Sequence, residues 1–348
     1  MIVGQRPMKS CMKHLRKNKP GIGAVYAVGM GLLLLSAVLG VLLGATRLGI
    51  SDWIHVIRGT EPSGTAARIL LYVRLPRVAA SLICGAALAV SGAVLQGVLA
   101  NRLASASIIG VNAGAGLAVT LCAAAGIAGG WRLSLSAFAG AFATVMVVSF
   151  GAKKWGASRG TVILMGVAIN SLLGAVSDAV TTLVPNVSIL RNDFKVGDFS
   201  AVTYPKLIPA AILILSALVL LYTLSNELDV LTLGDESARS LGMNTGVTRT
   251  LFLMLAAALA GAAVSIAGLL SFVGLLVPHA VRRVATGEAR HLIPLSALFG
   301  AGFVTLCDTL SRIVFAPYEL PVGILMAFLG APFFLLILIR GKGGHSRA

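Results

Sequence analysis

Two arginines three positions apart, Arg74 and Arg77, precede a long apolar run. Residues three apart share one face of a helix, so both guanidinium groups could project together from its end. A third arginine, Arg312, ends another apolar run, four positions after Asp308. Guanidinium groups pair bidentately with carboxylates, so these arginines could dock an acidic protein surface. Anchoring at the lipid interface and a local ion pair between Asp308 and Arg312 are the alternatives.

Three other polar side chains fall within or beside apolar runs. Asp178 lies in a run long enough to cross a bilayer, and Gln96 and Asn101 lie at the end of another. Acidic groups at membrane depth are costly and are functional by default. Asp178 therefore either lines a pathway or accepts hydrogen bonds from a neighbour, and Gln96 and Asn101 approach one mouth of such a pathway.

One polar stretch between apolar runs has the signals of a short helix. It covers Asn226–Asn244 and reads NELDVLTLGDESARSLGMN. Asp235 suits a helix N-cap, and Gly242 suits a C-terminal stop. An acid in the first turn also favours the helix dipole. We expect a short helix over Glu236–Leu241 that lies across the membrane surface.

The composition is that of an integral membrane protein. Hydrophobic residues make up 57% and charged residues 11% of the 348 residues, whereas soluble domains carry about 25% charged residues. A span needs about 20 mostly apolar residues, so the sequence predicts an all-α integral membrane protein with about ten transmembrane helices. The expected spans are 22–44, 76–98, 107–127, 133–152, 161–184, 206–226, 248–267, 270–286, 292–311 and 321–340.

The positive charges give these spans an orientation. The net charge is +16, but the Lys and Arg residues lie between the apolar runs rather than on one face. That pattern indicates cytoplasmic membrane loops, not a nucleic-acid surface. We expect a basic cytoplasmic N-terminal tail at 1–21, a polytopic transmembrane domain at 22–340 with a cytoplasmic loop at 227–247, and a cytoplasmic C-terminal tail at 341–348.

A weak internal repeat accompanies the spans. Residues Ala86–Gly97 (AALAVSGAVLQG) match Ala257–Gly268 (AALAGAAVSIAG) at five of twelve positions. In the expected topology the first copy runs inward and the second outward. This predicts an inverted repeat, with a pathway between the halves.

The sequence lacks the motifs of an ATP-binding or metal-dependent enzyme. Gly151–Ser158 (GAKKWGAS) has the glycine spacing of a phosphate-binding loop but no lysine after the second glycine. There is no Ser/His/Asp arrangement and no Cys/His cluster. We expect no catalytic residue, no metal site and no cofactor in this chain.

Several sequence motifs together resemble one family. VRLPR at Val73–Arg77 is followed by GAALAVSGAVLQG at Gly85–Gly97; later come LTLGDESARSLGMN, SFVGLLVPHAVRR, CDTLSR and ELPVGILMAFLGAPFF. In this order and spacing they closely resemble the permease subunits of ABC importers for iron–siderophores, haem and cobalamin. The resemblance covers nearly the whole chain after its first span.

The resemblance implies roles for the matching residues. Arg74, Arg77 and Arg312 would dock an extracytoplasmic substrate-binding protein. Asn101, with Gln96, would close a cytoplasmic gate together with Ser158 and Thr161, although the family's prolines after the asparagine are missing here. The loop that seats into the ATPase subunit would comprise Gly234, Asp235, Glu236, Ser237, Ala238, Arg239, Leu241 and Gly242.

The function implied is that of a cell-membrane permease subunit with both termini cytoplasmic. It would pair with a second permease copy or paralogue, two ATPase subunits and the binding protein. The expected cargo is an iron(III)–siderophore, moved by alternating access, with haem or cobalamin as alternatives. An ion-coupled secondary transporter is the rival class. It would require a series of membrane acids, of which only Asp178 is expected to lie deep.

Overall fold

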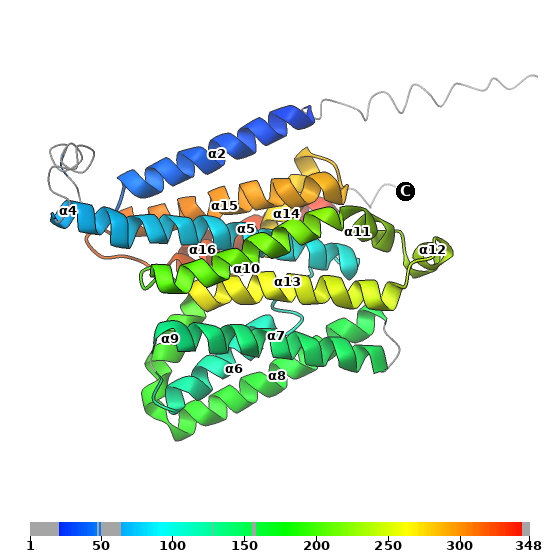
Figure 1. The fold of residues 1–348 in the computed structure, drawn as a ribbon, viewed down its shortest axis with the longest axis horizontal. Helices are drawn as coiled ribbons and strands as arrows, with labels where there is room; N and C mark the ends of the chain where they lie inside the picture. The colour runs from blue at the N-terminus through cyan, green and yellow to red at the C-terminus, as the bar shows by residue number, and fades with distance from the viewer. Residues whose placement is uncertain (1–20, 47–48, 50–63, 128, 155–157, 343–348) are drawn as a thin grey trace, which may run out of the picture.

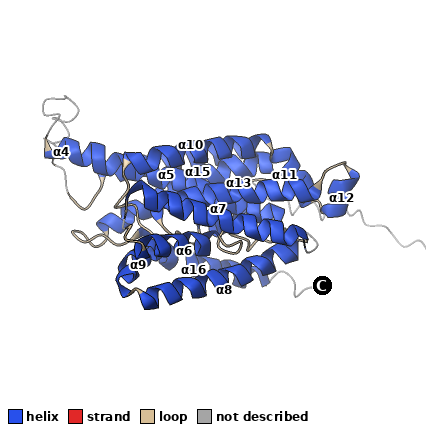
Figure 2. Ribbon diagram, turned by 60° about the horizontal axis from the view of Figure 1, so that its bottom comes forward, coloured by secondary structure: helices blue, strands red, loops and turns tan. Residues whose placement is uncertain are grey.

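The computed structural model describes residues 21–46, 49, 64–127, 129–154 and 158–342, the last seven by their backbone alone. All regular secondary structure in these residues is helical (Figures 1 and 2). The elements are α2 (Ile22–Leu42), α4 (Thr65–Arg68), the π-helix η1 (Ile69–Arg74), α5 (Leu75–Val98), α6 (Val111–Ala124), α7 (Gly130–Lys154), α8 (Arg159–Leu183), the 3-10 helix η2 (Pro185–Val187), α9 (Ser188–Val196), α10 (Tyr204–Thr223), α11 (Ser225–Thr232), α12 (Asp235–Ser240), α13 (Thr245–Ala267), α14 (Val273–Val284), α15 (Ala289–Ile313) and α16 (Val322–Lys342).

Each predicted span overlaps one of the longer helices. By length and composition, seven helices in the described residues could cross a membrane. The remaining three predicted spans fall on α6, α14 and α16. Of these, α14 is the shortest, with 12 residues that include Pro278, Arg282 and Arg283. The membrane fold is therefore confirmed, and the count of ten spans stays a prediction.

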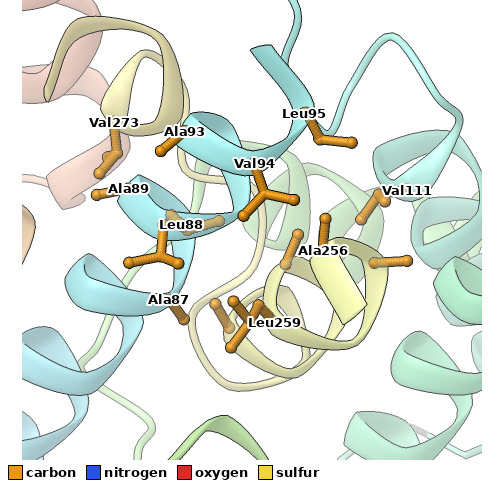
Figure 3. Packing of buried hydrophobic residues seen from close by; sticks show 14 of the residues in the cluster. Ala87, Leu88, Ala89, Ala93, Val94, Leu95, Val111, Ala256, Leu259 and Val273 are labelled. Atoms are coloured by element: carbon orange, nitrogen blue, oxygen red, sulfur yellow. The ribbon is translucent and has the colours of Figure 1, made fainter. Parts of the chain in front are cut away.

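Helix α5 forms the centre of the bundle, packed against α13, α14 and α15. Figure 3 shows its Val94 beside Ala256 of α13, and its Ala93 and Ala89 toward Val273 of α14. Small residues allow the backbones to approach closely. A Cβ on Gly92 would lie 1.9 Å from the Gly274 carbonyl oxygen, and one on Gly85 would lie 2.4 Å from that of Gly300. Neither glycine can be replaced without moving a whole helix.

Helices α5 and α13 carry the two copies of the internal repeat and run antiparallel. The Ser91 hydroxyl donates to the Ala256 carbonyl at 2.8 Å, and the Cys84 thiol lies 3.7 Å from the Ala263 carbonyl. As residue numbers rise along α5, the numbers of their partners fall along α13, so the two helices run in opposite directions. The two copies of an inverted repeat would do the same. The repeat itself stays a prediction.

The helical stretch that carries Arg74 begins before the predicted start of its span at residue 76. Pro76 favours the first turn of a helix, yet one continuous helical stretch covers Thr65–Val98. A proline inside a helix removes one backbone hydrogen bond. The π-helical turn η1 immediately before Pro76 accommodates this loss by shifting the hydrogen-bond pattern.

Two short helices, α9 and α11, have no counterpart among the predicted elements. Both are amphipathic and too short to give a hydropathy signal. They lie at opposite ends of the elongated bundle: α9 shares one end with α4, and α11 shares the other with α12 (Figures 1 and 2). We call these the α9 end and the α12 end.

Candidate functional site

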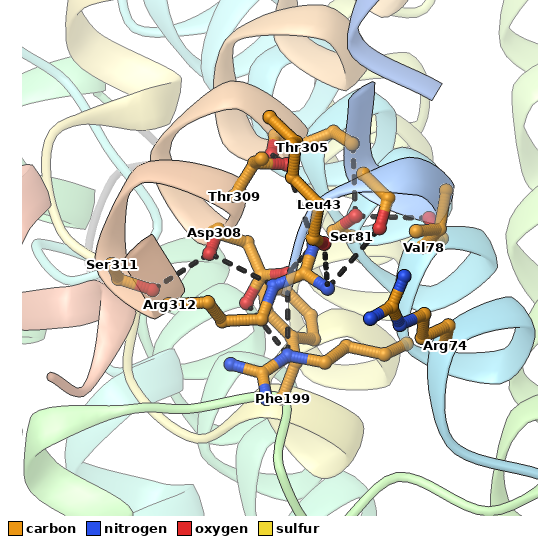
Figure 4. Close-up of polar contacts among 12 residues, drawn as sticks. Leu43, Arg74, Val78, Ser81, Phe199, Thr305, Asp308, Thr309, Ser311 and Arg312 are labelled. Atoms are coloured by element: carbon orange, nitrogen blue, oxygen red, sulfur yellow. Dashed lines mark hydrogen bonds and ion pairs between the residues drawn. The ribbon is translucent and has the colours of Figure 1, made fainter. Parts of the chain in front are cut away.

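At the α9 end, a fully buried carboxylate lies between two arginines. Asp308 on α15 accepts a hydrogen bond from Arg77 Nε on α5 at 3.0 Å and lies 3.2 Å from an Arg312 amino group on its own helix. The predicted local ion pair between Asp308 and Arg312 is therefore confirmed. Figure 4 shows Asp308 and Arg312 on one helix turn, with Ser311 donating to the Asp308 carbonyl.

Arg77 joins this buried carboxylate to two loops. Its Nη1 donates to Glu319 at 2.6 Å, and its Nη2 lies 3.6 Å from Asp198. Asp198 follows α9, and Glu319 precedes α16. One guanidinium thus ties α5 to α15 and to both loops. Neither Asp198 nor Glu319 was predicted, although Glu319 begins the ELPVGILMAFLGAPFF motif.

Arg74 points elsewhere, toward the C-terminal end of α2. It donates to the carbonyls of Val41 and Leu42 at 2.8 Å each and to that of Thr46 at 2.6 Å. Arg312 donates to two more carbonyls near this end, those of Gly40 and Leu43. The last carbonyls of a helix have no partner within it and carry partial negative charge, so cations stabilise them.

The three arginines are only 2–3% exposed. In this conformation their hydrogen bonds go to acceptors of the chain itself, and Arg74 and Arg77 do not project together from a helix end. Direct docking to a partner's carboxylates stays a prediction.

Asp178 lies near the α9 end of α8, and its side chain is 70% exposed. Its carboxylate accepts a hydrogen bond from Arg191 of α9. Of the two explanations offered by the sequence, hydrogen bonding to a neighbour is confirmed. Its depth in the membrane stays a prediction, because exposure on α8 does not place the side chain relative to a bilayer.

At the α12 end, the predicted helix Glu236–Leu241 is confirmed to within one residue as α12, but its predicted N-cap is wrong. The N-cap is Gly234, at φ 112°. The Asp235 carboxylate instead accepts two hydrogen bonds from Arg249 of α13, at 2.6 and 2.8 Å, and lies 3.4 Å from Arg159 of α8. The hydrogen bond from Arg249 lowers the pKa of Asp235, so the carboxylate stays charged.

The other end of α12 is closed by the predicted stop at Gly242. Gly242 has φ 83°, its N–H donates to the Arg239 carbonyl at 2.9 Å, and the Met243 N–H donates to the Ala238 carbonyl at 3.0 Å. This is the Schellman pattern, which favours glycine. Helix α12 is thus joined to α13 and α8 at its first residue and ended locally at Gly242.

The two faces of α12 differ in exposure. Ala238 is fully buried within the chain, so it does not face a partner. Glu236, Ser237, Arg239 and Ser240 are exposed. Leu241, directly after α12, is 66% exposed, and Leu233, shortly before it, is 65% exposed. Leu241 belongs to the predicted coupling loop, whereas the exposure of Leu233 was not predicted.

The predicted gate residues fall into separate groups. Gln96 is buried; its amide donates to the Gly274 carbonyl at 3.0 Å, and its carbonyl oxygen accepts from Arg282. Asn101 accepts from the backbone N–H of Leu103 in a local turn.

Ser158 caps α8 by accepting from the Thr161 N–H at 3.1 Å. Its hydroxyl also lies 2.8 Å from the Thr161 hydroxyl. No hydrogen bond recorded in the described residues joins this pair to Gln96 or Asn101. A gate made by both groups stays a prediction.

A helical bundle with seven helices able to cross a membrane in its described residues is the architecture of a multi-pass membrane protein. More narrowly, the chain belongs to the FecCD transport family, which matches residues 32–340.

Individual relatives agree with this assignment. The chain is 35% identical to the hemin transport system permease protein HmuU of Yersinia pestis, over 91% of this chain and 97% of that protein. It is 33% identical to the Fe(3+)-citrate import system permease protein YfmE of Bacillus subtilis, over 94% and 97%. A solved inward-facing structure of a metal-chelate type ABC transporter covers 91% of this chain and 99% of its own, with a TM-score of 0.81 and 27% identity.

The chain is therefore an ABC importer permease, a membrane subunit that is not itself an enzyme. Permeases of this kind work with separate ATPase and substrate-binding partners. Among the described residues, no three His, Cys, Asp or Glu side chains gather as a metal site would require.

Proposed function

We propose that this permease imports an iron(III)–siderophore through a path shared with a second permease subunit. The observation that carries the proposal is α12, a short helix whose Asp235 pairs with Arg249 and Arg159, which ends at Gly242 and bears exposed residues at the α12 end of the bundle. The named activities of the relatives, hemin and ferric citrate transport among them, support a metal chelate as cargo. Haem and cobalamin remain the alternative cargoes.

In the proposed arrangement, α12 seats in a groove of an ATPase subunit, with a second ATPase on the second permease. Arg249 of α13 and Arg159 of α8 hold the first residue of α12. ATP-driven movement of the ATPases would therefore reach two long membrane helices directly. Those helices would then rock between inward-open and outward-open arrangements, which is alternating access.

The exposed face of α8 is the proposed wall of the path. Exposed side chains of α2 and α10 are apolar, tyrosine or small hydroxyl side chains such as Ser216 and Thr223. Helix α8 exposes an acid as well, Asp178, among its apolar residues. Polar groups on a membrane helix are costly against lipid and usually face water or protein. The second permease, identical or paralogous, would supply the opposite wall.

The substrate-binding protein would dock at the α9 end, which is extracytoplasmic in this proposal, with both termini cytoplasmic and the protein in the cell membrane. Arg74, Arg77 and Arg312 are the proposed docking residues. Since Arg77 is occupied by Glu319, we propose that a carboxylate of the binding protein takes the place of Glu319. The exchange would free the loop before α16.

The cargo can be tested in vesicles that contain the permease, its ATPase and its binding protein. We expect ATP-driven accumulation of a radiolabelled ferric siderophore, and at least tenfold less of haem and of cobalamin at equal concentration. Vesicles without the binding protein are the control. A preference for haem or cobalamin would contradict the siderophore assignment and leave the permease function intact.

A further inference from the structure

An open apolar groove lies between α2, α14 and α15, toward the α12 end. Its volume is about 410 Å³, and every residue that lines it is Ala, Val, Leu or Phe. Val25, Val28 and Leu32 come from α2, and Val277 and Val281 from α14; Phe299 and Phe303 come from α15. Such a groove suits a hydrocarbon chain and offers nothing to a polar ligand.

The groove exists because α2 packs on α15 and α5 but not closely on α14. At the α9 end the contact is tight: a Cβ on Gly40 would lie 2.9 Å from Val78. At the α12 end, by contrast, Val28 remains 63% exposed. The polar contact recorded there joins the Tyr26 hydroxyl to His291 at 3.3 Å. We call the part of the groove between α2 and α14, which is open to the membrane, the slot.

Positive charge borders the slot at the α12 end. Arg283 is exposed on the last turn of α14, three positions after the lining residue Ala280 and one before the lining residue Val284. Arg290 is exposed on the first turn of α15 and lies within electrostatic range of Tyr26. Within the described chain, neither arginine has a recorded hydrogen bond or ion pair with an acidic group.

The neighbouring charged residues do not neutralise this border. Arg282 points to the other side of α14, where it donates to Gln96 and to the Ala93 carbonyl. Glu288 lies within electrostatic range of Asp229 on α11, away from α2. Two arginines above a hydrocarbon slot have the charge and shape that match an anionic phospholipid, and basic pockets between membrane helices on the cytoplasmic side bind such headgroups.

We propose that this groove binds one anionic phospholipid of the cytoplasmic leaflet, with an acyl chain between α2 and α14 and the phosphate at Arg283 and Arg290. The assignment to the cytoplasmic leaflet rests on the orientation given in the proposed function. The binding site itself does not depend on that orientation. The bound acyl chain fills the space that the described residues of α2 and α14 leave between them. A soluble phosphate would interact with the two arginines alone and leave the apolar groove empty, so it is not the expected occupant.

The test is native mass spectrometry of the full chain released from bilayer nanodiscs with equal phosphatidylglycerol and phosphatidylcholine. We expect the wild type to retain phosphatidylglycerol preferentially. The double variant Arg283→Gln, Arg290→Gln should retain about 25-fold less, since each arginine near a membrane surface contributes about a fivefold factor. Arg132→Gln is the control, because Arg132 is exposed on the first turn of α7 against Trp131.

A second pair of variants tests the slot itself. Val28→Trp should fill its mouth and reduce retention of both lipids, whereas Val38→Trp, exposed on the same helix but outside the lining, should not. Equal retention of the two lipids by the wild type would overturn the proposal. So would a double variant that behaves like Arg132→Gln, or a change from dimer to monomer with Val28→Trp, which would mean that a second chain covers the groove. The assay needs no ATP, cargo or partner, so its failure leaves the transport function untouched.

Discussion

Replacing Asp308 with alanine is expected to lower the free energy of unfolding by about 3–5 kcal/mol, the cost of breaking a buried ion pair from one side. Asp308 is fully buried and neutralises both Arg77 and Arg312. Without it, two guanidinium groups stay buried with Glu319 and Asp198 as the remaining carboxylates. The loss should appear as a large fall in the unfolding temperature of the chain purified in detergent, or as failure to accumulate in the membrane.

Asp178→Ala is the matched control. It removes another carboxylate that pairs with an arginine on a membrane helix, but this one is exposed. Exposed ion pairs contribute about 0–1 kcal/mol, so the unfolding temperature should change little. Equal effects of the two substitutions would mean that the buried cluster contributes no more than a surface pair.

Leu241→Asp is expected to weaken association with the ATPase subunit about tenfold to a hundredfold, and to abolish ATP-driven uptake with it. Burying a leucine side chain at an interface contributes about 1.5–3 kcal/mol, and an aspartate there would add a buried charge. Leu241 is exposed in the isolated chain, so its replacement should not impair folding. Association can be measured by titrating the labelled ATPase onto permease in nanodiscs.

Ile189→Asp serves as the control for this variant. Ile189 is 73% exposed, but it lies on α9 at the opposite end of the bundle. ATPase affinity should therefore stay at the wild-type value. If Leu241→Asp binds the ATPase as tightly as Ile189→Asp does, α12 is a solvated connector rather than the coupling element. Ala238 is a poor choice for this purpose, because it packs inside the permease and a larger side chain there would disturb α12 itself.

The positions of the membrane helices could be predicted from sequence because each depends on a local run of apolar residues. The helix over Glu236–Leu241 could be predicted for a similar reason, since its stop signal at Gly242 lies within one turn. Helices α9 and α11 could not, because short amphipathic segments resemble polar loops in hydropathy.

The functions of the charged residues were harder to predict because their partners are distant in sequence. Asp235 has the right type and place for an N-cap, yet Arg249 and Arg159 hold its side chain. Arg77 meets Asp308 and Glu319 more than two hundred positions later. Only the ion pair between Asp308 and Arg312, four residues apart on one helix, could be read directly from the sequence.

The most direct test of the central claim is the energy source for uptake in sealed vesicles that contain the permease, its ATPase and its binding protein. The account predicts that chelate accumulation requires ATP, stops when vanadate traps the ATPase, and is unaffected when an ionophore collapses the proton gradient. Uptake that persists without ATPase and follows the proton gradient would contradict it, and would place the chain among ion-coupled secondary transporters.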